Sequence, residues 1–436
     1  MKVLLVGSGG REHALAWKLS RSVLVDDLLV WPGNPAMTPF AKPLGLPAAA
    51  PLDEVIQKAC EQSVDFVVVG PEKPLADGLA DRCQQVGLPV FGPVKAAAEL
   101  EASKAFAKDV MAAAEIPTAS YQVVSGEQEC RSVAMRSLKE KGGTVIKASG
   151  LASGKGVFVC KSEADIEEGL KRLYGGSMAG AAATVVIEDI LEGRECSYFC
   201  MVGQQGASRL GFAVDFKRLK DGDQGPNTGG MGCYSPVSWL PADAADRVEK
   251  EVVAPLLKEL ERRGIRYQGY LYVGLMWNEK GPSVVEFNVR LGDPEAQVLV
   301  VQDDRDWVPM IARQVGIEVD QSLVQDRAPS IQRKAVAVVM ASQGYPYGEG
   351  EAAPMDLAAE TFANQGIDQA VFAASIQENE GRLKTGNGRV LCVVAADTSF
   401  QDARKKAYQQ VSELAKNWQG VQYRQDIALR MVRESE

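Results

Sequence analysis

The first 93 residues alternate short apolar runs with helical patterns, and this alternation constrains the fold more than any other feature. The apolar runs cover 3–6, 28–31, 66–69 and 89–92, and a helix is predicted over 12–20. Buried strands that alternate with helices form a parallel sheet with helices on its faces. The loops after three of these strands, at 7–11, 32–34 and 70–74, should then share the sheet edge where ligands bind.

The rest of the chain changes pattern several times. One long helix is predicted over 96–114, because an apolar face runs through it and Ile116-Pro117 closes it. A small α+β module follows, then longer strands that suggest an antiparallel sheet, a polar linker and a small α/β tail domain. The module covers 121–190, the antiparallel strands 197–301, the linker 320–333 and the tail domain 334–415. Within the module, the small residues of 175–183 predict a mobile loop.

Composition narrows the function. The net charge is −9 and the pI is near 5.1, which disfavours a non-specific nucleic-acid binder. No run approaches the ~18 apolar residues of a membrane span, and the start does not resemble a signal peptide, so a cytoplasmic enzyme of small molecules is expected. The eight cysteines form no CxxC pair, and the one histidine, His13, excludes histidine-rich metal sites.

The turn GSGGREHA at residues 7–14 resembles a dinucleotide fingerprint, but Glu12 stands where the third glycine belongs. The second strand ends in Trp31-Pro-Gly-Asn34, without the acid that would bind an NAD ribose, so NAD is disfavoured. A glycine turn before a helix still suits a phosphate, with Arg11 adding charge. A tight turn with no ligand remains the alternative.

A second glycine-rich turn, GLASGKG at 150–156, fails the Walker A pattern because it is one residue short and ends in Gly156. Between two strands, with Lys147 just before it, it suits a flap over nucleotide phosphates. The acids of 188–195 are either solvated or bind adenine and ribose.

The segment EFNVRLGDPE at 286–295 carries more information. Strand alternation places Glu286, Asn288 and Arg290 on one face. Glu and Asn supply the hard oxygen ligands that Mg²⁺ prefers, and an arginine beside them suits a transferring phosphoryl group. DFKR at 215–218 with GPNTGGMG at 225–232 predicts a loop whose backbone approaches a ligand closely, or else a structural Ω-loop.

Together with VVVGPEKPLADGLAD, AELEASKAFAKDVM and the tail motifs QGYP, GRVL and YRQDI, these segments resemble the glycinamide ribonucleotide synthetase family of the ATP-grasp superfamily. The resemblance covers nearly the whole chain. It implies an N-terminal substrate-binding α/β domain at 1–102, an ATP-grasp domain at 103–326 with a lid at about 123–190, and a C-terminal domain at 327–436. It also implies a monomeric ligase that joins glycine to 5-phosphoribosylamine through a glycyl phosphate, using ATP and Mg²⁺ or Mn²⁺.

The resemblance also implies residue roles, with Arg290, Lys147 and Asp293 taking part in catalysis. ATP would contact Lys104, Lys147, Gly150, Gly154, Lys155, Gly156, Glu188, Ile190 and Glu195. The metal would bind Glu286 and Asn288. The substrates would contact Gly9, Gly10, Arg11, Glu12, Asn34, Glu72, Asp215, Lys217, Asn227, Thr228, Gly229 and Asp293.

Some positions depart from the family pattern. Phe216 and the FAASI segment at 372–376 replace histidines, Ser149 replaces an Asp, and Ser153 replaces an Ala. These changes put histidine-dependent roles in doubt. Two alternatives stay open: a carboxylase of aminoimidazole ribonucleotide, which GPNTGGMG disfavours, and a non-catalytic binder with the same fold.

Overall fold

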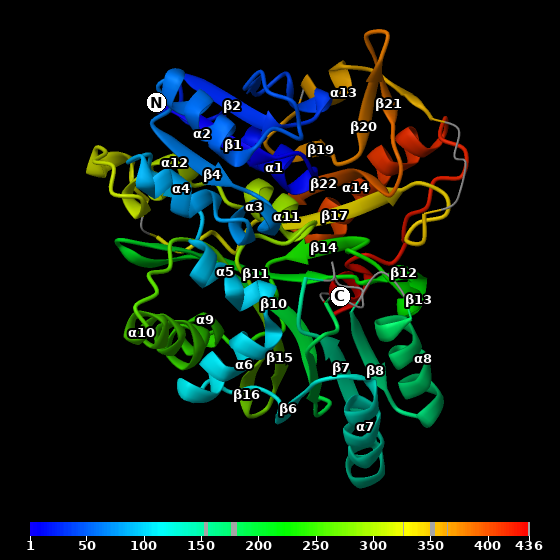
Figure 1. The fold of residues 1–436 in the computed structure, drawn as a ribbon. Helices are drawn as coiled ribbons and strands as arrows, with labels where there is room; N and C mark the ends of the chain where they lie inside the picture. Colours follow the sequence, from blue (N-terminus) through cyan, green and yellow to red (C-terminus); the bar gives the residue numbers. More distant parts are fainter. Residues whose placement is uncertain (152–155, 176–180, 326, 349–353, 364, 435–436) are drawn as a thin grey trace.

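The computed structural model describes residues 1–434 except 152–155, 176–180, 326, 349–353 and 364. The N-terminal part is a five-stranded sheet of order β3-β2-β1-β4-β5 in which every neighbouring pair is parallel, which confirms the predicted architecture (Figure 1). The strands are β1 (Lys2–Gly7), β2 (Asp27–Pro32), β3 (Lys42–Pro43), β4 (Phe66–Val69) and β5 (Val90–Phe91). The helices are α1 (Gly10–Leu19), α2 (Leu52–Glu61), α3 (Glu72–Ala76) and α4 (Leu79–Gln85).

The single helix predicted over 96–114 is wrong, because the structure has two helices there. These are α5 (Lys95–Ala102) and α6 (Lys104–Ala113). Ser103 between them has an extended backbone, and its hydroxyl caps α6 by accepting from the N–H of Phe106 at 3.2 Å. The alanine-rich pattern runs through the break, but a serine that prefers the N-cap restarts the helix.

A four-stranded antiparallel sheet with two helices, called the lid below, follows. Its order is β6-β9-β7-β8, with β6 (Tyr121–Val124), β7 (Thr144–Ala148), β8 (Val157–Cys160) and β9 (Val185–Glu188). Helices α7 (Glu127–Lys141) and α8 (Glu163–Tyr174) pack on the face that carries Ile146 and Ile187. Alternation turns the side chains of Lys147 and Glu188 to the opposite face. Much of the loop predicted to be mobile lies outside the described residues.

The central sheet has eight strands, and its neighbours are antiparallel throughout. The order is β16-β15-β10-β11-β14-β17-β22-β19. Its first five members are β16 (Gly281–Asn288), β15 (Gly269–Asn278), β10 (Arg194–Gly203), β11 (Gly206–Asp215) and β14 (Gly232–Ser235). The last three come from the tail: β17 (Lys334–Ala341), β22 (Arg389–Asp397) and β19 (Gln369–Ala373). Three strands of the tail therefore extend the central sheet, and β18, β20 and β21 form a separate small sheet.

Smaller elements complete the fold. Hairpins are formed by β12 (Arg218–Lys220) with β13 (Gln224–Asn227), and by β20 (Ile376–Asn379) with β21 (Arg382–Thr385), which also pairs with β18 (Asp356–Leu357). The helices are α9 (Ala244–Val248), α10 (Ala254–Arg262), α11 (Glu295–Gln302), α12 (Trp307–Gln314), α13 (Glu360–Ala363), α14 (Phe400–Ala415) and α15 (Leu429–Arg433). None of the helices in the described part of the chain is long and apolar enough to cross a membrane.

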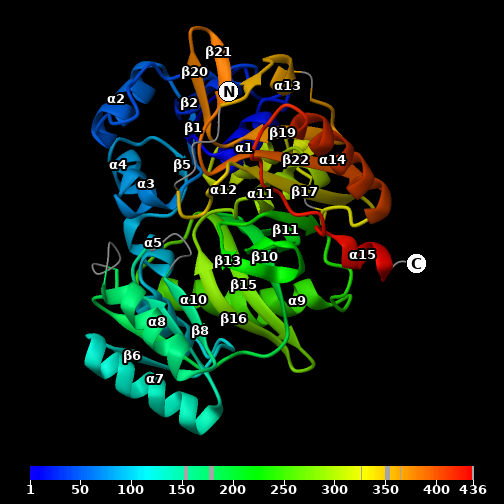
Figure 2. The same ribbon diagram turned by 90° about the vertical axis from the view of Figure 1, so that its right-hand side faces the viewer.

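Helix α11 lies where the parts of the chain meet. All eight of its residues are buried, and it packs against α1 and against β14, β17 and β22. In both views the blue N-terminal sheet and the orange C-terminal strands lie side by side above the green strands of the central sheet, with the lid below (Figures 1 and 2). Asp293, just before α11, and Glu295, its first residue, are thereby fixed between the N-terminal and C-terminal parts.

Candidate active site

A buried carboxylate on the lid holds two lysines. Lys147 Nζ lies 2.9 Å from Glu188 Oε2 and donates to the backbone oxygen of Val285 at 3.0 Å. Lys108 on α6 lies 3.3 Å from the other oxygen, Glu188 Oε1, and donates to Thr118 Oγ1 at 2.7 Å. Burial lowers the pKa of Lys108 to about 8, although Glu188 raises it. The lid is thus joined to β16 at Val285 by a cation that faces the site.

Lys104 begins α6 at the base of the glycine-rich turn. Its N–H donates to the backbone oxygen of Ser149 at 2.9 Å, and the Ser149 hydroxyl accepts from the N–H of Ala105 at 3.1 Å. Burial lowers the pKa of Lys104, and the carboxylate of Glu286 opposes that shift. Ser149, where the resembled family has Asp, therefore fixes the turn to the N-terminus of α6.

Only the two ends of the predicted flap are described. The N–H of Gly150 donates to Ala181 O at 3.1 Å, and a Cβ on Gly150 would lie 2.9 Å from Ala181 Cα, so a side chain has no room there. Gly156 O accepts from the N–H of Ala148 at 2.8 Å. Gly154, Lys155 and Ser153 lie outside the described residues.

The predicted metal ligands lie side by side. Asn288 Nδ2 donates to Glu286 Oε1 at 3.4 Å at the end of β16. Burial raises the pKa of Glu286, but the lysines at 217, 104 and 147 outweigh it, so the pKa lies below its ordinary value. The described residues contain no group of three or more His, Cys, Asp or Glu side chains arranged to hold a metal. A Mg²⁺ here would have one carboxylate and one amide from the protein and would need phosphate oxygens or water.

Arg290 lies just past the end of β16 and not on the strand, yet it stays beside Asn288. Its Nη2 lies 2.7 Å from Glu101 Oε1 and 3.4 Å from Asn288 Oδ1, and its Nε lies 3.3 Å from Glu72 Oε2. Burial raises the pKa of Glu101, with Arg290 opposing the shift, and the N–H of Val289 donates to Glu101 at 2.9 Å. Arg290 therefore links the candidate metal pair to α3 and α5.

Asp215 and Lys217 face the same space from the end of β11. Burial raises the pKa of Asp215 to about 6, with Lys217 opposing the shift. Burial lowers the pKa of Lys217, but Glu195 and Asp215 outweigh it and hold the pKa well above its ordinary value. Lys217 forms a short ion pair with Glu195. Glu295 on α11 is buried, and burial together with Asp215 raises its pKa to about 8.

The loop after β13 is pinned to this strand end. The N–H of Thr228 donates to the backbone oxygen of Lys217 at 2.7 Å, and Thr228 Oγ1 donates to it at 2.9 Å. The N–H of Gly230 donates to Thr228 Oγ1 at 3.0 Å. Asn227 is exposed and lies opposite Arg218 in the hairpin.

Two carboxylates of the chain occupy the N-terminal glycine turn. Glu12 accepts from the N–H of Gly9 at 2.7 Å. The guanidinium of Arg11 is paired within the chain, because its Nε lies 2.5 Å from Glu12 Oε1 and its Nη1 donates to Leu291 O at 2.9 Å. Asp293 lies on the other side of the turn and accepts from the N–H of Arg11 at 3.4 Å. A substrate phosphate at this turn would compete with these protein groups.

Glu12 also explains why the glycine pattern departs from a dinucleotide site. A Cβ on Gly7 would lie 2.2 Å from Glu12 Cγ, and a Cβ on Gly70 would lie 2.3 Å from Glu12 Oε1. The Gly10 position is less tight, because its Cβ would lie 2.9 Å from Gln297 Nε2. The glycines thus make room for a buried carboxylate of the chain.

Asn34 and His13 join the N-terminal part to the tail. Asn34 Nδ2 donates to Ser8 O at 2.7 Å and to Ala373 O at 3.2 Å. His13 Nδ1 accepts from the N–H of Ala373 at 2.9 Å, and burial lowers the pKa of His13 to about 3 despite that bond. The lone histidine is therefore a neutral core side chain, ringed by Phe40, Phe362 and Phe372.

The other predicted nucleotide contact is Ile190, just beyond β9. Its side chain packs on Gly143, where a Cβ would lie 2.6 Å from Ile190 Cδ1. The backbone N–H and C=O of Ile190 form no hydrogen bond within the described part of the chain. Both groups are thus available to a planar ligand edge.

The site also contains residues that the sequence did not single out. They are Lys108, Glu101, Glu295 and Arg389, whose Nη1 lies 3.4 Å from Asp293 Oδ1. Lys108 lies one helical turn after Lys104, a spacing that puts both lysines on one face of α6 and is the only sequence signal for it. The other three take their meaning from partners that are distant in the chain.

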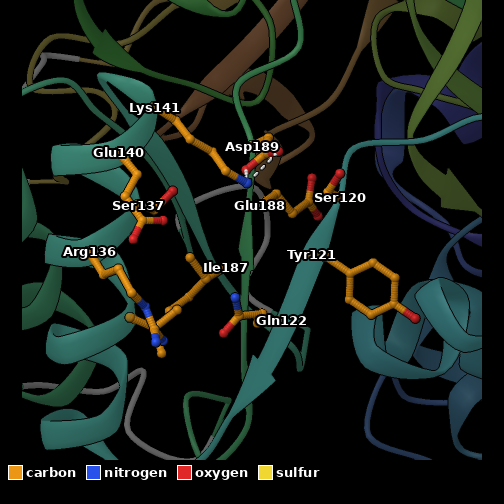
Figure 3. A pocket seen from close by; sticks show the side chains of 11 residues that line it. Ser120, Tyr121, Gln122, Arg136, Ser137, Glu140, Lys141, Ile187, Glu188 and Asp189 are labelled. Atoms are coloured by element: carbon orange, nitrogen blue, oxygen red, sulfur yellow. Dashed lines mark hydrogen bonds and ion pairs between the residues drawn. The ribbon is translucent and has the colours of Figure 1, made fainter.

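A separate groove of about 400 Å³, including its open mouth, lies between α7 and strands β6 and β9 (Figure 3). Arg136, Glu140 and Lys141 of α7 border it, and Lys141 Nζ lies 2.7 Å from Asp189 Oδ1. Acids thus accompany the basic side chains, so the groove lacks the excess positive charge that a phosphate needs. The groove lies beside the cluster around Lys147, because Glu188 borders the groove and also pairs with Lys147.

Comparison with protein families matches three models in chain order. They describe the N domain, the ATP-grasp (A) domain and the C domain of phosphoribosylglycinamide synthetase, and they match residues 1–101, 102–296 and 335–430. Together they cover far more than half of the chain.

Relatives that match almost the whole chain include proteins named phosphoribosylamine–glycine ligase. The relative from Agrobacterium fabrum is 39% identical over 428 residues, 98% of each chain, and that from Haemophilus influenzae is 38% identical over 99% of each. The crystal structure of the ligase from Thermotoga maritima has a TM-score of 0.80 at 33% identity and covers 98% of this chain and 100% of its own. A biotin carboxylase domain from Hydrogenobacter thermophilus, at TM-score 0.70 and 15% identity over 97% of this chain and 91% of its own, shares the fold alone.

Proposed function

The chain belongs to the phosphoribosylglycinamide synthetase family, and we propose that it joins glycine to 5-phospho-D-ribosylamine at the expense of ATP. The products are N1-(5-phospho-D-ribosyl)glycinamide, ADP and phosphate. The reaction is the second step of de novo purine (IMP) biosynthesis.

The chemistry needs an activated carboxyl group. A glycine carboxylate is a poor acyl donor, because the leaving group would be oxide. Its oxygen therefore attacks the γ-phosphorus of ATP and displaces ADP, which gives glycyl phosphate. The amine of phosphoribosylamine then attacks the carbonyl carbon, the C–O bond to phosphate breaks, and the nitrogen loses a proton. No covalent enzyme intermediate is required, so the protein acts by positioning and electrostatics.

The observation that carries the proposal is the bond from Lys147 Nζ to the backbone oxygen of Val285, at 3.0 Å. It brings the lid lysine to the strand that bears Glu286, and Lys104 approaches from α6. With Lys217, which follows β11, three lysines thus surround one candidate metal ligand. Such a cluster suits the phosphates of ATP, with Lys104 and Lys147 as their contacts and Lys108 and Glu188 behind Lys147.

The pair Glu286 and Asn288 fits a divalent cation, because the two neighbouring side chains offer a carboxylate and an amide oxygen, which are hard ligands. Mg²⁺ or Mn²⁺ bound there would neutralise charge on the transferring phosphoryl group. Arg290, held by Glu72 and Glu101, stands beside this pair and is ready to stabilise phosphoryl oxygens. We assign adenine and ribose to Glu188, the backbone of Ile190 and Glu195.

The substrate side is assigned to the neighbouring cluster. Asp215, Lys217, the loop at 227–230 and Asp293 would surround glycine and its acyl phosphate. The turn at 9–12, Asn34 and Glu72 would form the phosphoribosylamine site, with phosphate contacts made after Arg11 or the turn amides exchange their present partners. The enzyme would work as a cytoplasmic monomer on these small molecules, with domains at 1–102, 103–326 and 327–436 and the lid at about 123–190.

The test is ADP release from the purified chain with Mg²⁺-ATP, glycine and freshly generated phosphoribosylamine. ADP should form only when all three are present, and replacing glycine with alanine should reduce its rate strongly. Full turnover without glycine would overturn the ligase assignment, and bicarbonate-dependent turnover would point instead to a carboxylase.

A further inference from the structure

We propose that Arg389, at the start of β22, is a positioning residue that locks the loop at 227–232 against Asp293. Its Nη1 donates to Gly229 O at 2.7 Å and to the backbone oxygen of Asp293, and it lies 3.4 Å from Asp293 Oδ1. The inference rests on the proposed function, because both partners belong to the assigned glycine site. It gives the C-terminal domain a direct part in shaping that site.

The contact is close enough to require glycine in the loop. A Cβ on Gly229 would lie 3.0 Å from Arg389 Cζ. A Cβ on Gly230 would lie 2.6 Å from Pro294 Cδ and 3.3 Å from Asp293 O. The two glycines therefore let the loop backbone pack directly against the guanidinium of Arg389 and against the 293–294 peptide.

A second tail residue holds the same glycine. Tyr345, four residues after β17, accepts from the N–H of Gly229 at 2.8 Å through its hydroxyl. Both backbone polar groups of Gly229 are thus bound by side chains of the tail, one from Tyr345 and one from Arg389. A loop fixed through its N–H and its C=O has little freedom to shift.

The base of the hairpin that precedes the loop is held from the tail as well. Arg424 is buried, and its Nη1 donates to Asp223 Oδ1 at 2.7 Å and to Arg218 O at 3.2 Å. Its guanidinium lies 4.7 Å from the ring centroid of Phe216. Asp426 accepts from the N–H of Gly222 at 2.8 Å. Phe216, which replaces the family's histidine, thus packs under an arginine of the tail.

The two arginines have different tasks. The contacts of Arg424 stay within the hairpin base and the tail, whereas Arg389 touches the loop and Asp293 together. Asp293 also accepts from the N–H of Arg11 at the glycine turn. Arg389 therefore joins three segments at the glycine site, and its loss should misplace Asp293 and the loop while leaving Lys104 and Lys147 in place.

The experiment compares Arg389→Ala and Arg389→Lys with Arg382→Ala, a control in the same tail. The side chain of Arg382 is 74% exposed, and its ion pair with Asp356 is long, at 3.8 Å. Wild-type activity is measured first, so that failure of the proposed function is recognised separately. Arg389→Ala should raise the KM for glycine about tenfold or more, with the KM for ATP changed less than about twofold. Arg389→Lys should recover part of the loss, and added guanidinium ion should partly rescue Arg389→Ala.

Hydrogen exchange supplies a readout that does not depend on activity. The amides of 224–232 should exchange faster in Arg389→Ala than in Arg382→Ala, and those of β1 and β4 should not change. The proposal is overturned if loop exchange and glycine KM match the control, or if glycine and ATP affinities fall together with faster exchange throughout the chain. Should Arg389→Ala fail to fold, Arg389→Lys decides by the same two measurements.

Discussion

Lys108 and Glu188 form a buried ion pair, with Lys108 Nζ 3.3 Å from Glu188 Oε1. The side chains are only 2% and 3% exposed, so neither charge can be solvated if the other is removed. The same carboxylate holds Lys147 at 2.9 Å, which makes Lys108 the fixed support behind a residue assigned to ATP.

Replacing Lys108 with Met should therefore lower the free energy of unfolding by about 3 kcal/mol, because Glu188 keeps its charge with one lysine fewer. It should also raise the KM for ATP, since Lys147 is drawn more strongly to Glu188. Urea unfolding and steady-state kinetics measure both effects. Lys139→Met, an exposed lysine on α7, is the control and should change stability by less than about 0.5 kcal/mol. An unchanged ATP KM in Lys108→Met would contradict the supporting role.

Glu286→Ala should reduce turnover at least about 100-fold, because the divalent cation loses its only charged protein ligand in the assigned pair. Glu279→Ala, an exposed carboxylate in the turn before β16, should keep the wild-type rate. Titration with Mn²⁺ followed by electron paramagnetic resonance should show weaker binding in Glu286→Ala alone. A near-normal rate in that variant would show that the metal lies elsewhere.

His13 predicts one component of the pH dependence of stability. Its pKa falls from an ordinary value of 6.5 to about 3 because it is buried, so the unfolded chain binds a proton that the folded chain does not. The stabilisation is complete above pH 6.5 and is lost as the pH falls towards 3, by up to about 1.4 kcal/mol per pH unit. His13→Gln keeps an acceptor for the N–H of Ala373 and should lose this component between pH 7 and 5. If the free energy of unfolding depends on pH in the same way in both proteins, His13 does not supply this component.

Glu295 predicts the opposite slope. Burial and Asp215 raise its pKa from 4.5 to about 8, so the folded chain binds a proton that the unfolded chain has released. Its stabilising contribution is present below pH 4.5 and is lost as the pH rises to 8, again by up to about 1.4 kcal/mol per unit. Glu295→Gln should therefore gain stability relative to wild type on going from pH 5 to pH 8. The midpoints of urea unfolding at the two pH values measure this difference. An equal shift of the midpoint in both proteins would contradict a protonated Glu295 in the folded chain.

Much of the fold follows from local pattern. The apolar runs at 3–6 and 66–69 lie within or coincide with β1 and β4, and the helix predicted over 12–20 corresponds to α1, at Gly10–Leu19. Short-range signals suffice for these elements, because strand alternation and helix caps depend on residues that are close in the sequence. The break at Ser103 was missed, since a serine within an alanine-rich run is compatible with both a continuous helix and a new N-cap.

What could not be predicted depends on partners that are distant in the sequence. Asp293 contacts Arg11, which lies 282 positions away in the sequence, and Arg389, which lies 96 positions away. No residue next to either arginine in the sequence indicates this contact. The pairing of β14 with β17, which makes the tail strands part of the central sheet, is of the same kind. Motifs indicated which residue types carry the chemistry, whereas the supporting network of Lys108, Glu101 and Arg389 became visible only in three dimensions.

Transfer of oxygen from glycine to phosphate tests the central claim most directly. The chain is given glycine labelled with ¹⁸O in its carboxylate, together with Mg²⁺-ATP and phosphoribosylamine, and the released phosphate is analysed by mass spectrometry. A glycyl phosphate intermediate predicts one ¹⁸O atom in each phosphate, because the carboxylate oxygen that attacks ATP leaves with the phosphoryl group. Phosphate that forms in step with glycinamide ribonucleotide but carries no label would contradict the mechanism.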